Sequence, residues 1–307
     1  MTRSNLLETL RQRPLLCDGA MGTQLIARGL TGGACAELWN VQQPQVIAAI
    51  HTAYLTAGCA MITTNTFGAC SAALTRHGLG ERTAELNRAG AKLARKAADD
   101  AGGERWVLGD IGPFGDFLEP LGEMTLVELE AIFRQQAAAL YEGGADGVIV
   151  ETMVDPAESA AAIRAAKAVN DWPVIATFAF NRVGDGVLTF RTVMGVAAGD
   201  AVRQAIAAGA DIVGANCGTS LSLEDYAALS AELVQAAGDT PVIVQPNAGS
   251  PSMVDGQLRH PAKPHDMAAA IPCFLKAGVR VIGGCCGTTP AHLQAMAATM
   301  GQRGATA

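Results

Sequence analysis

The stretch GADGVIVE, residues 144–151, carries the pattern that decides the fold of this 307-residue chain. Its first residue is a glycine, Ala145 and Asp146 follow, and the stretch then continues as a nearly unbroken run of Val and Ile. The stretch GADIVGAN, residues 209–216, repeats it closely, and the segments after Gly58 and Gly278 repeat it in looser form. Because a glycine at a helix end supplies a left-handed cap, the pattern predicts helices that turn directly into strands.

Eight short apolar runs of this kind follow one another along the chain. Their near-continuous apolar character is typical of parallel strands that are covered on both faces. Helix start signals lie between them, such as Thr125 with Glu128 three positions on, a capping-box pattern. The predicted strands are Leu15–Asp18, Ala60–Asn65, Trp106–Ile111, Gly147–Glu151, Val174–Phe178, Asp211–Asn216, Val242–Gln245 and Val279–Gly283, and the predicted helices include Gln45–Ala57, Leu126–Glu142, Ala157–Val169, Leu223–Ala237 and Ala291–Met300.

Eight strand–helix units in about 300 residues match the number and size of a (β/α)8 TIM barrel, an α/β fold. The alternative is a doubly wound open sheet, which would carry a glycine-rich dinucleotide loop after its first strand. The segment DGAMG, residues 18–22, lacks that fingerprint. We therefore expect a single barrel domain over residues 1–307, with a flexible tail at residues 301–307.

The composition narrows the class of protein further. Half of the residues are hydrophobic, and Lys and Arg total 22 against 29 Asp and Glu, for a net charge of -7. An acidic balance without a basic stripe argues against nucleic acid as a partner. No apolar run reaches the roughly 18 residues of a membrane span, and the first residues form no secretory signal. We therefore expect a cytoplasmic protein, without membrane contact, whose eight cysteines are reduced.

Chemically active side chains follow the predicted strands at their carboxyl ends, where the loops of a barrel form one mouth. Strands six and eight are separated by only one strand around a barrel, so Cys217 can lie beside Cys285 and Cys286 despite their distance in sequence. The side chains at these ends are Asp18, Asn65, Asp110, Glu151, Asn216, Cys217, Asn247, Cys285 and Cys286.

Three thiolates that converge on one point suit Zn2+, and three protein ligands leave a position open for water or substrate. A substrate thiol bound there would lose its proton near neutral pH, which points to chemistry at substrate sulfur. From the spacing alone, GGCCG (residues 283–287) is as compatible with a tight loop of packed cysteines, and a vicinal disulfide is a further alternative. Likewise, Glu151 could be a solvated strand end and Asp18 a turn cap.

These motifs together resemble the homocysteine S-methyltransferase family over nearly the whole chain. The resemblance implies zinc-dependent transfer of a methyl group to the thiol of L-homocysteine, which yields methionine. It implies that Cys217, Cys285 and Cys286 are the zinc ligands. The matching segments are DGAMGT (18–23), TNTFG (64–68), DIGP (110–113), VET (150–152), Asn216-Cys217, PNAG (246–249) and GGCCGTTP (283–290).

The resemblance also assigns the substrate contacts. Asp18 and Glu151 are expected to hold the substrate ammonium, and backbone N–H groups at Ala20 and Met21 to meet its carboxylate. Asn247 matches a position that can fill the fourth zinc site when substrate is absent.

The methyl donor is less directly implied, because family members use a methylated corrinoid, S-methylmethionine or betaine. The segments PNAGSP (246–251), KPHDM (263–267) and GTTP (287–290) most resemble the cobalamin-dependent methionine synthase branch, whereas the S-methylmethionine branch usually has Arg in place of Gly287. An aromatic cage for betaine is not evident. We expect methylcobalamin on a separate corrinoid protein as the donor, with betaine or S-methylmethionine as alternatives. A non-catalytic zinc-binding scaffold subunit is an alternative of another class.

Overall fold

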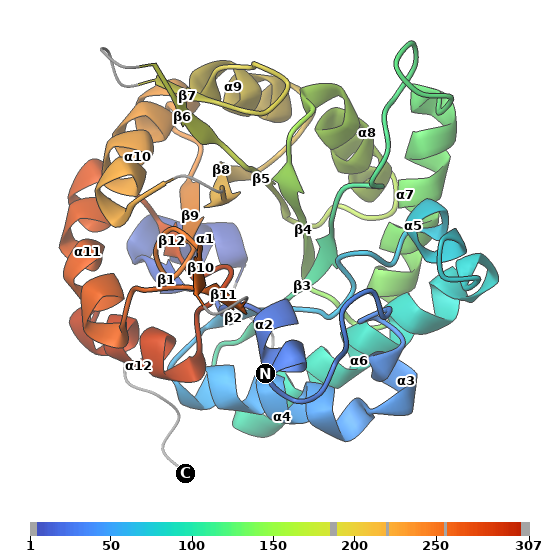
Figure 1. Cartoon of the computed structure of the whole chain (residues 1–307), viewed down its shortest axis with the longest axis horizontal. Coiled ribbons are helices and arrows are strands. Elements are labelled where there is room, and N and C mark those ends of the chain that lie inside the picture. The colour runs from blue at the N-terminus through green and yellow to red at the C-terminus, as the bar shows by residue number, and fades with distance from the viewer. Residues whose placement is uncertain (1–4, 185–188, 219–220, 255–256, 302–307) are drawn as a thin grey trace.

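The computed structural model describes residues 5–184, 189–218, 221–254 and 257–301. Its centre is a ring of eight parallel strands (Figure 1). These strands are β1 (Leu15–Leu16), β2 (Met61–Thr63), β3 (Trp106–Ile111), β4 (Gly147–Met153), β5 (Val174–Phe178), β8 (Ile212–Cys217), β9 (Val242–Pro246) and β12 (Val281–Ile282). Their neighbour order is β1-β12-β9-β8-β5-β4-β3-β2, and a parallel bridge between Cys17 and Met61 brings the two end strands together. The predicted TIM barrel is confirmed.

Helices surround the strands, one after each barrel strand (Figure 1). They are α4 (Pro44–Thr56), α6 (Thr83–Ala101), α7 (Leu126–Glu142), α8 (Pro156–Lys167), α9 (Ala198–Ala207), α10 (Leu223–Ala237), α11 (Pro264–Ala277) and α12 (Pro290–Thr299). The capping box predicted at Thr125 and Glu128 begins α7. Of the helices in the described residues, none has both the length and the apolar character needed to cross a bilayer.

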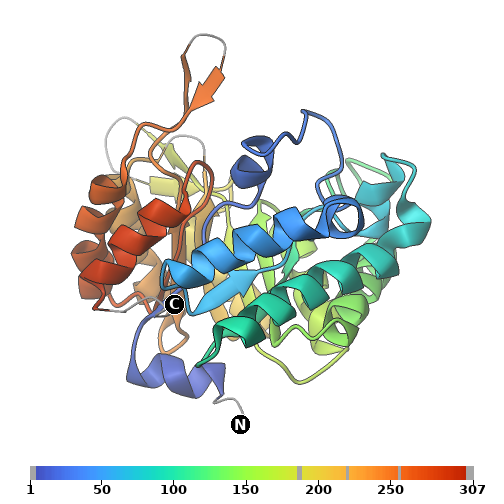
Figure 2. The ribbon, with the colours of Figure 1, turned by 90° about the horizontal axis from the view of Figure 1, so that it is seen from below.

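Shorter elements decorate this frame. α1 (Leu6–Gln12) lies at the amino-terminal end of the barrel, whereas the hairpin of β10 (Ser252–Val254) and β11 (Gln257–Arg259) projects from the other end (Figure 2). The remaining elements are α2 (Gly22–Ile26), α3 (Trp39–Gln42), α5 (Ser71–Thr75), the 3-10 helix Gly80–Arg82, and the hairpin of β6 (Asn181–Val183) and β7 (Thr189–Arg191). Residues 302–307, most of the predicted tail, lie outside the described residues.

Several predicted strand limits near the mouth were wrong, although single backbone hydrogen bonds, such as that from Gly284 N–H to the Asp18 carbonyl, continue beyond the regular ladder. β1 ends at Leu16 rather than Asp18, β2 ends at Thr63, and β12 covers only Val281–Ile282. β4 instead runs past Glu151 to Met153, with an irregular register where Thr152 has a positive φ of 61°.

The barrel interior is layered, and this layering places the site. An apolar layer includes Met61, Leu108, Ile149, Ile175 and Ile243 and packs with Leu6 and Leu10 of α1. Side chains on a strand alternate between its two faces, so the residue two positions further on points inward again, nearer the mouth. Those positions are polar, and they form a polar floor above the apolar layer: Thr63, Asp110, Glu151, Thr177 and Gln245.

Candidate metal and substrate site

Three cysteines meet on one side of the barrel mouth. Cys217 ends β8, while Cys285 and Cys286 lie in the loop after β12. Their Sγ atoms all lie within 4.8 Å of one another, and Cys217 Sγ is 3.9 Å from Cys286 Sγ. In the part of the chain that the structure describes, this is the one group of three or more Cys, His, Asp or Glu with ligand atoms so placed. All three are free thiols, so the vicinal disulfide is not formed.

The backbone at Cys217 is held in an unusual conformation. Cys217 and Thr152 have φ angles of 57° and 61°, the only positive values among non-glycine residues in the described ranges. The Asn216 side chain accepts from Thr152 N–H at 2.9 Å and donates to Thr152 Oγ1 at 2.7 Å. The Cys217 carbonyl accepts from the Tyr226 hydroxyl at 2.5 Å. Such strained residues cluster at functional sites, where neighbouring hydrogen bonds fix them.

The loop that carries the other two cysteines is anchored to β9 and its following turn. Cys285 N–H donates to the Pro246 carbonyl at 2.9 Å, and Ala248 N–H donates to the Cys286 carbonyl at 2.9 Å. A side chain at Gly284 would clash, since a Cβ there would lie 2.6 Å from Thr288 Oγ1. The glycine is therefore needed for this loop to pack.

Asn247 lies beside this cluster, and the nitrogen of its side-chain amide is hydrogen-bonded whereas the oxygen is not. Its Nδ2 donates to the Gly218 carbonyl at 2.7 Å. Its Oδ1 is buried and accepts no hydrogen bond from any described residue. A buried carbonyl oxygen without a partner is costly, so this atom is available to a ligand.

The electrostatics of the thiols favour a cation. Hydrogen bonds from Cys285 and Cys286 lower the pKa of the Cys217 thiol to about 3, whereas the contact with Cys217 raises the pKa of both Cys285 and Cys286. One of the three thiols therefore ionises readily, and ionisation of the other two is disfavoured. A divalent cation among the sulfurs would let all three ionise. Three thiolates with one spare amide oxygen are a donor set that fits zinc.

The wall of the mouth from β1 to β4 is acidic, and it adjoins the thiols where β1 pairs with β12. Asp18 is buried after β1, and its Oδ2 accepts from Thr63 N–H at 2.8 Å. Glu151, on β4, accepts from Asn216 Nδ2 at 3.4 Å. Burial raises the pKa of Asp18 to about 7, and burial followed by the charge of Asp18 raises the pKa of Glu151. A positively charged ligand would thus stabilise the ionised form of both carboxyl groups.

One cavity of about 300 Å3 joins the two sides. No Lys, Arg or His lines it among the residues that the structure describes. A positive charge must therefore come from a ligand or a metal. The polar and sulfur-bearing side chains of its lining are Thr23, Glu37, Thr63, Thr64, Asn65, Thr66, Asp110, Glu151, Thr152, Cys217, Gln245, Cys285 and Cys286, and Met21.

The two backbone donors predicted for a substrate carboxylate differ in availability. Ala20 N–H donates to Thr288 Oγ1 at 3.0 Å and is therefore already used. Met21 immediately precedes α2, lines the cavity, and its N–H has no acceptor among the described residues. Of the two, only the Met21 N–H is free to meet an anion.

Two acidic residues of the cavity have no role predicted from the sequence. The sequence pattern predicts Asp110 only as a strand-end residue, and it does not single out Glu37. Glu37 precedes α3 and accepts from Gly68 N–H at 2.7 Å. Nothing in its local sequence signals this contact, whereas the inward alternation on β3 could have placed Asp110 in the mouth.

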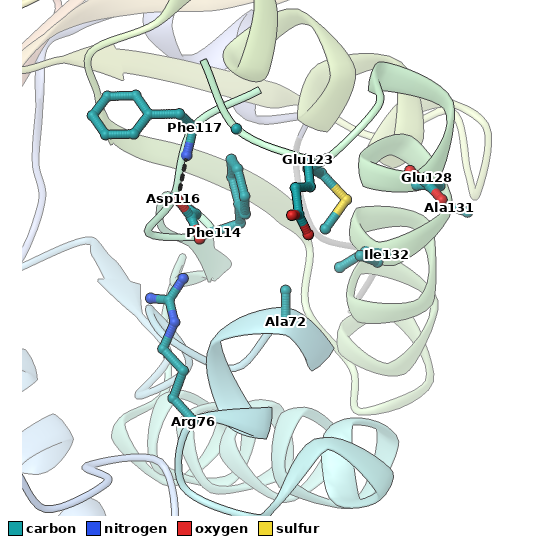
Figure 3. A pocket seen from close by; sticks show the side chains of 11 residues that line it. Ala72, Arg76, Phe114, Asp116, Phe117, Glu123, Glu128, Ala131 and Ile132 are labelled. Atoms are coloured by element: carbon teal, nitrogen blue, oxygen red, sulfur yellow. Dashed lines mark hydrogen bonds between the residues drawn. The ribbon is translucent and has the colours of Figure 1, made fainter. Parts of the chain in front are cut away.

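A larger hollow, of about 720 Å3, lies outside the barrel between α5, α7 and the loop after β3 (Figure 3). Arg76, directly after α5, points toward Phe114 and Asp116 of that loop. The hollow contains none of the predicted site residues. Size alone therefore does not identify the site, and the chemistry lies in the smaller cavity.

Comparison with known proteins agrees with this geometry. A family model described as Homocysteine S-methyltransferase matches residues 15–300. The methionine synthase of Mycobacterium tuberculosis is 34% identical over 316 residues, covering 97% of this chain but 25% of its own length. The chain thus spans about a quarter of the curated relatives it matches.

A solved structure resembles the chain over nearly its whole length. The homocysteine methyltransferase MmuM from Escherichia coli, in its metallated form, is 27% identical with a TM-score of 0.77. The match covers 96% of this chain and 99% of that one. The oxidized form of the same protein gives 28% identity and a TM-score of 0.76.

Proposed function

The chain belongs to the homocysteine S-methyltransferase family of enzymes, and from this premise we propose that it transfers a methyl group to the sulfur of L-homocysteine to form methionine. The observation that carries the proposal is the single cavity with thiols on one side and carboxyl groups on the other. Homocysteine has a thiol at one end and an ammonium group near the other. Each side of the cavity thus has a complementary group on the substrate.

We assign Cys217, Cys285 and Cys286 as the ligands of a zinc ion, with Asn247 Oδ1 as a fourth ligand when substrate is absent. When bound, zinc lowers the pKa of a coordinated substrate thiol, so that it is a thiolate near neutral pH. The buried Asn247 oxygen without a partner and the convergence of the three Sγ atoms within 4.8 Å of one another support this assignment.

The remaining contacts orient the substrate. Asp18 and Glu151 hold the ammonium through charge-assisted hydrogen bonds, and the Met21 N–H, with that of Ala20 if Thr288 turns away, meets the carboxylate. Fixing the amino acid end aims the sulfur at the methyl carbon of the donor, and such positioning supplies much of the rate. The thiol proton leaves to solvent when the substrate binds. In the transfer, the sulfur–methyl bond forms with an electron pair of the thiolate, and the bond from methyl to donor breaks with its electron pair left on the donor.

For the donor, we propose a methyl group carried on cobalamin by a corrinoid protein. The relatives named methionine synthase are more similar in sequence than the solved homocysteine methyltransferase. Among the residues that the structure describes, Phe67 is the one aromatic residue that lines the cavity, and a single ring does not make a cage for betaine. At Gly287, with φ 80°, a Cβ would lie 2.3 Å from His260 Cγ, so an Arg at this position does not fit.

An assay with alternative donors tests this proposal. Zinc-loaded protein and homocysteine are incubated with methylcobalamin, a methylated corrinoid protein, S-methylmethionine or betaine, and methionine is measured. Methionine from the corrinoid donors alone is the expected result. Methionine from betaine or S-methylmethionine instead would overturn the donor. Zinc binding without homocysteine binding would indicate a scaffold subunit rather than an enzyme.

A further inference from the structure

Asp110 lies between the two carboxyl groups already assigned. It faces inward on β3, and β3 pairs with β2 on one side and with β4 on the other. Asp18 is bonded to Thr63 of β2, and Glu151 lies on β4. Going around the barrel, the three carboxyl groups therefore follow one another along one continuous wall of the mouth.

The Asp110 carboxyl group is nearly buried but lacks a full set of partners. Its side chain lines the cavity, and the residue is 5% exposed. Oδ1 has no hydrogen-bond donor among the described residues. The backbone is by contrast well tied, with N–H donating to Thr64 Oγ1 at 2.9 Å and the carbonyl accepting from Thr66 Oγ1 at 2.7 Å. The chain thus fixes the Asp110 backbone in place and leaves an oxygen without a partner on a side chain at the cavity wall.

Asp18 shows the opposite arrangement. It is 1% exposed, is not among the residues that line the cavity, and both of its oxygens lie within hydrogen-bond distance of Thr63. Asp18 therefore has less acceptor capacity left for a ligand than Asp110 has.

The burial of Asp110 and the negative charges around it favour the binding of a cation. Burial, and then the charges of Glu151, Asp18 and Glu37, raise the pKa of its carboxyl group. A buried carboxyl oxygen without a donor is costly, and no described lining residue carries a positive charge. A ligand with several N–H donors and a positive charge would satisfy these groups together.

We propose that Asp110 is a third acceptor for the substrate ammonium and makes the site select thiols that carry an α-amino group. An ammonium has three N–H donors, and Glu151, Asp18 and Asp110 each take one. The inference rests on the proposed function, since it concerns the same substrate at the same site.

The test compares two ligands on the zinc-loaded full chain by titration calorimetry. L-Homocysteine and 4-mercaptobutyrate share the thiol and the carboxylate, but only homocysteine has the amino group. Asp110→Asn keeps the shape of the side chain and removes its charge. We expect it to weaken homocysteine binding by roughly 10- to 100-fold, the range for a hydrogen bond to a charged group, and to leave binding of 4-mercaptobutyrate unchanged.

Glu158→Gln is the matched control. Glu158 is also a buried carboxyl group, bonded to Phe114 N–H at 2.7 Å, but it does not line the cavity. Its replacement should leave both affinities unchanged. If Asp110→Asn does not fold, Asp110→Ser takes its place, with thermal unfolding as the check.

The outcomes separate the two claims. Equal weakening of both ligands by Asp110→Asn, or no weakening of homocysteine, would overturn the role of Asp110 while homocysteine binding by the wild type upholds the site. A wild-type protein that binds zinc but not homocysteine would overturn the proposed function and this inference with it.

Discussion

The cavity at the barrel mouth has a thiol side and an acid side, and the two differ in how their polar atoms are held. On the thiol side, hydrogen bonds fix the backbone around Cys217 and Cys285 while the sulfurs face one another. On the acid side, Asp18 is occupied by Thr63, whereas Asp110 keeps an oxygen without a partner. Both sides carry acidic or polar groups, and no Lys, Arg or His among the described residues lines the cavity to balance them.

Each side therefore needs a positive charge, and the two charges come from different sources. In our account, a metal ion supplies it to the sulfurs and the substrate ammonium supplies it to the carboxyl groups. Substitutions on the two sides should therefore have separable effects. The Thr288 hydroxyl links the sides, since its Oγ1 accepts from Ala20 N–H and donates to the Cys285 carbonyl at 2.7 Å. Asn216 also links them, because its Nδ2 donates to Glu151 at 3.4 Å and to Cys285 Sγ at 3.9 Å.

Cys286→Ser should break the thiol side alone. Loss of a group that merely supports a metal ligand costs about 10- to 100-fold in affinity, so loss of a ligand should cost more than about 100-fold. Zinc affinity measured by competition with a chelator checks this. Cys273→Ser, at an exposed free cysteine on α11, is the control and should bind zinc normally. Equal zinc affinity in both variants would refute the ligand assignment.

Glu151→Gln should break the acid side alone. Charge-assisted hydrogen bonds contribute about 1.5–3 kcal/mol, so homocysteine binding should weaken by roughly 10- to 100-fold. Zinc content, measured on the same sample, should stay at the wild-type level. Loss of zinc from this variant would mean that the two sides are not separable.

The acid side also predicts how stability depends on pH. The folded pKa of Asp18, about 7, lies above its ordinary value of 3.8, so between these values the folded state binds more protons than the unfolded state. The contribution is present below about pH 4 and is lost as pH rises through about 7.

In urea unfolding of metal-free, reduced protein, Asp18 should thus contribute a fall on the order of 2 kcal/mol to the free energy of unfolding between about pH 5 and about pH 8. Asp18→Asn should show a smaller fall than the wild type. An identical pH dependence in the two proteins would show that burial of Asp18 has no such effect.

Thr288→Val should loosen the link between the sides. The change keeps the shape of the side chain but leaves the Ala20 N–H and the Cys285 carbonyl without this partner, at a cost of about 1–3 kcal/mol. We expect a lower midpoint of thermal unfolding and modestly weaker binding of both zinc and homocysteine. Thr299→Val, on the exposed end of α12, is a control that should change none of the three. An effect on only one side would show that Thr288 does not couple them.

Much of this site follows from the sequence, because glycine caps and apolar runs locate the strand ends and a barrel brings those ends together. Cys217, Cys285 and Cys286 meet as that reasoning predicts. The sequence does not show which polar atoms are already used. The Ala20 N–H is taken by Thr288, and the positive φ of Cys217 depends on partners distant in the chain. These features arise from packing between segments, which no local pattern encodes.

The central claim is that the thiol side receives the substrate sulfur. X-ray absorption at the zinc edge of the zinc-loaded protein, with and without L-homocysteine, tests it most directly. We predict that one oxygen or nitrogen ligand is replaced by sulfur when homocysteine is added. An unchanged sulfur number with homocysteine bound would contradict the account.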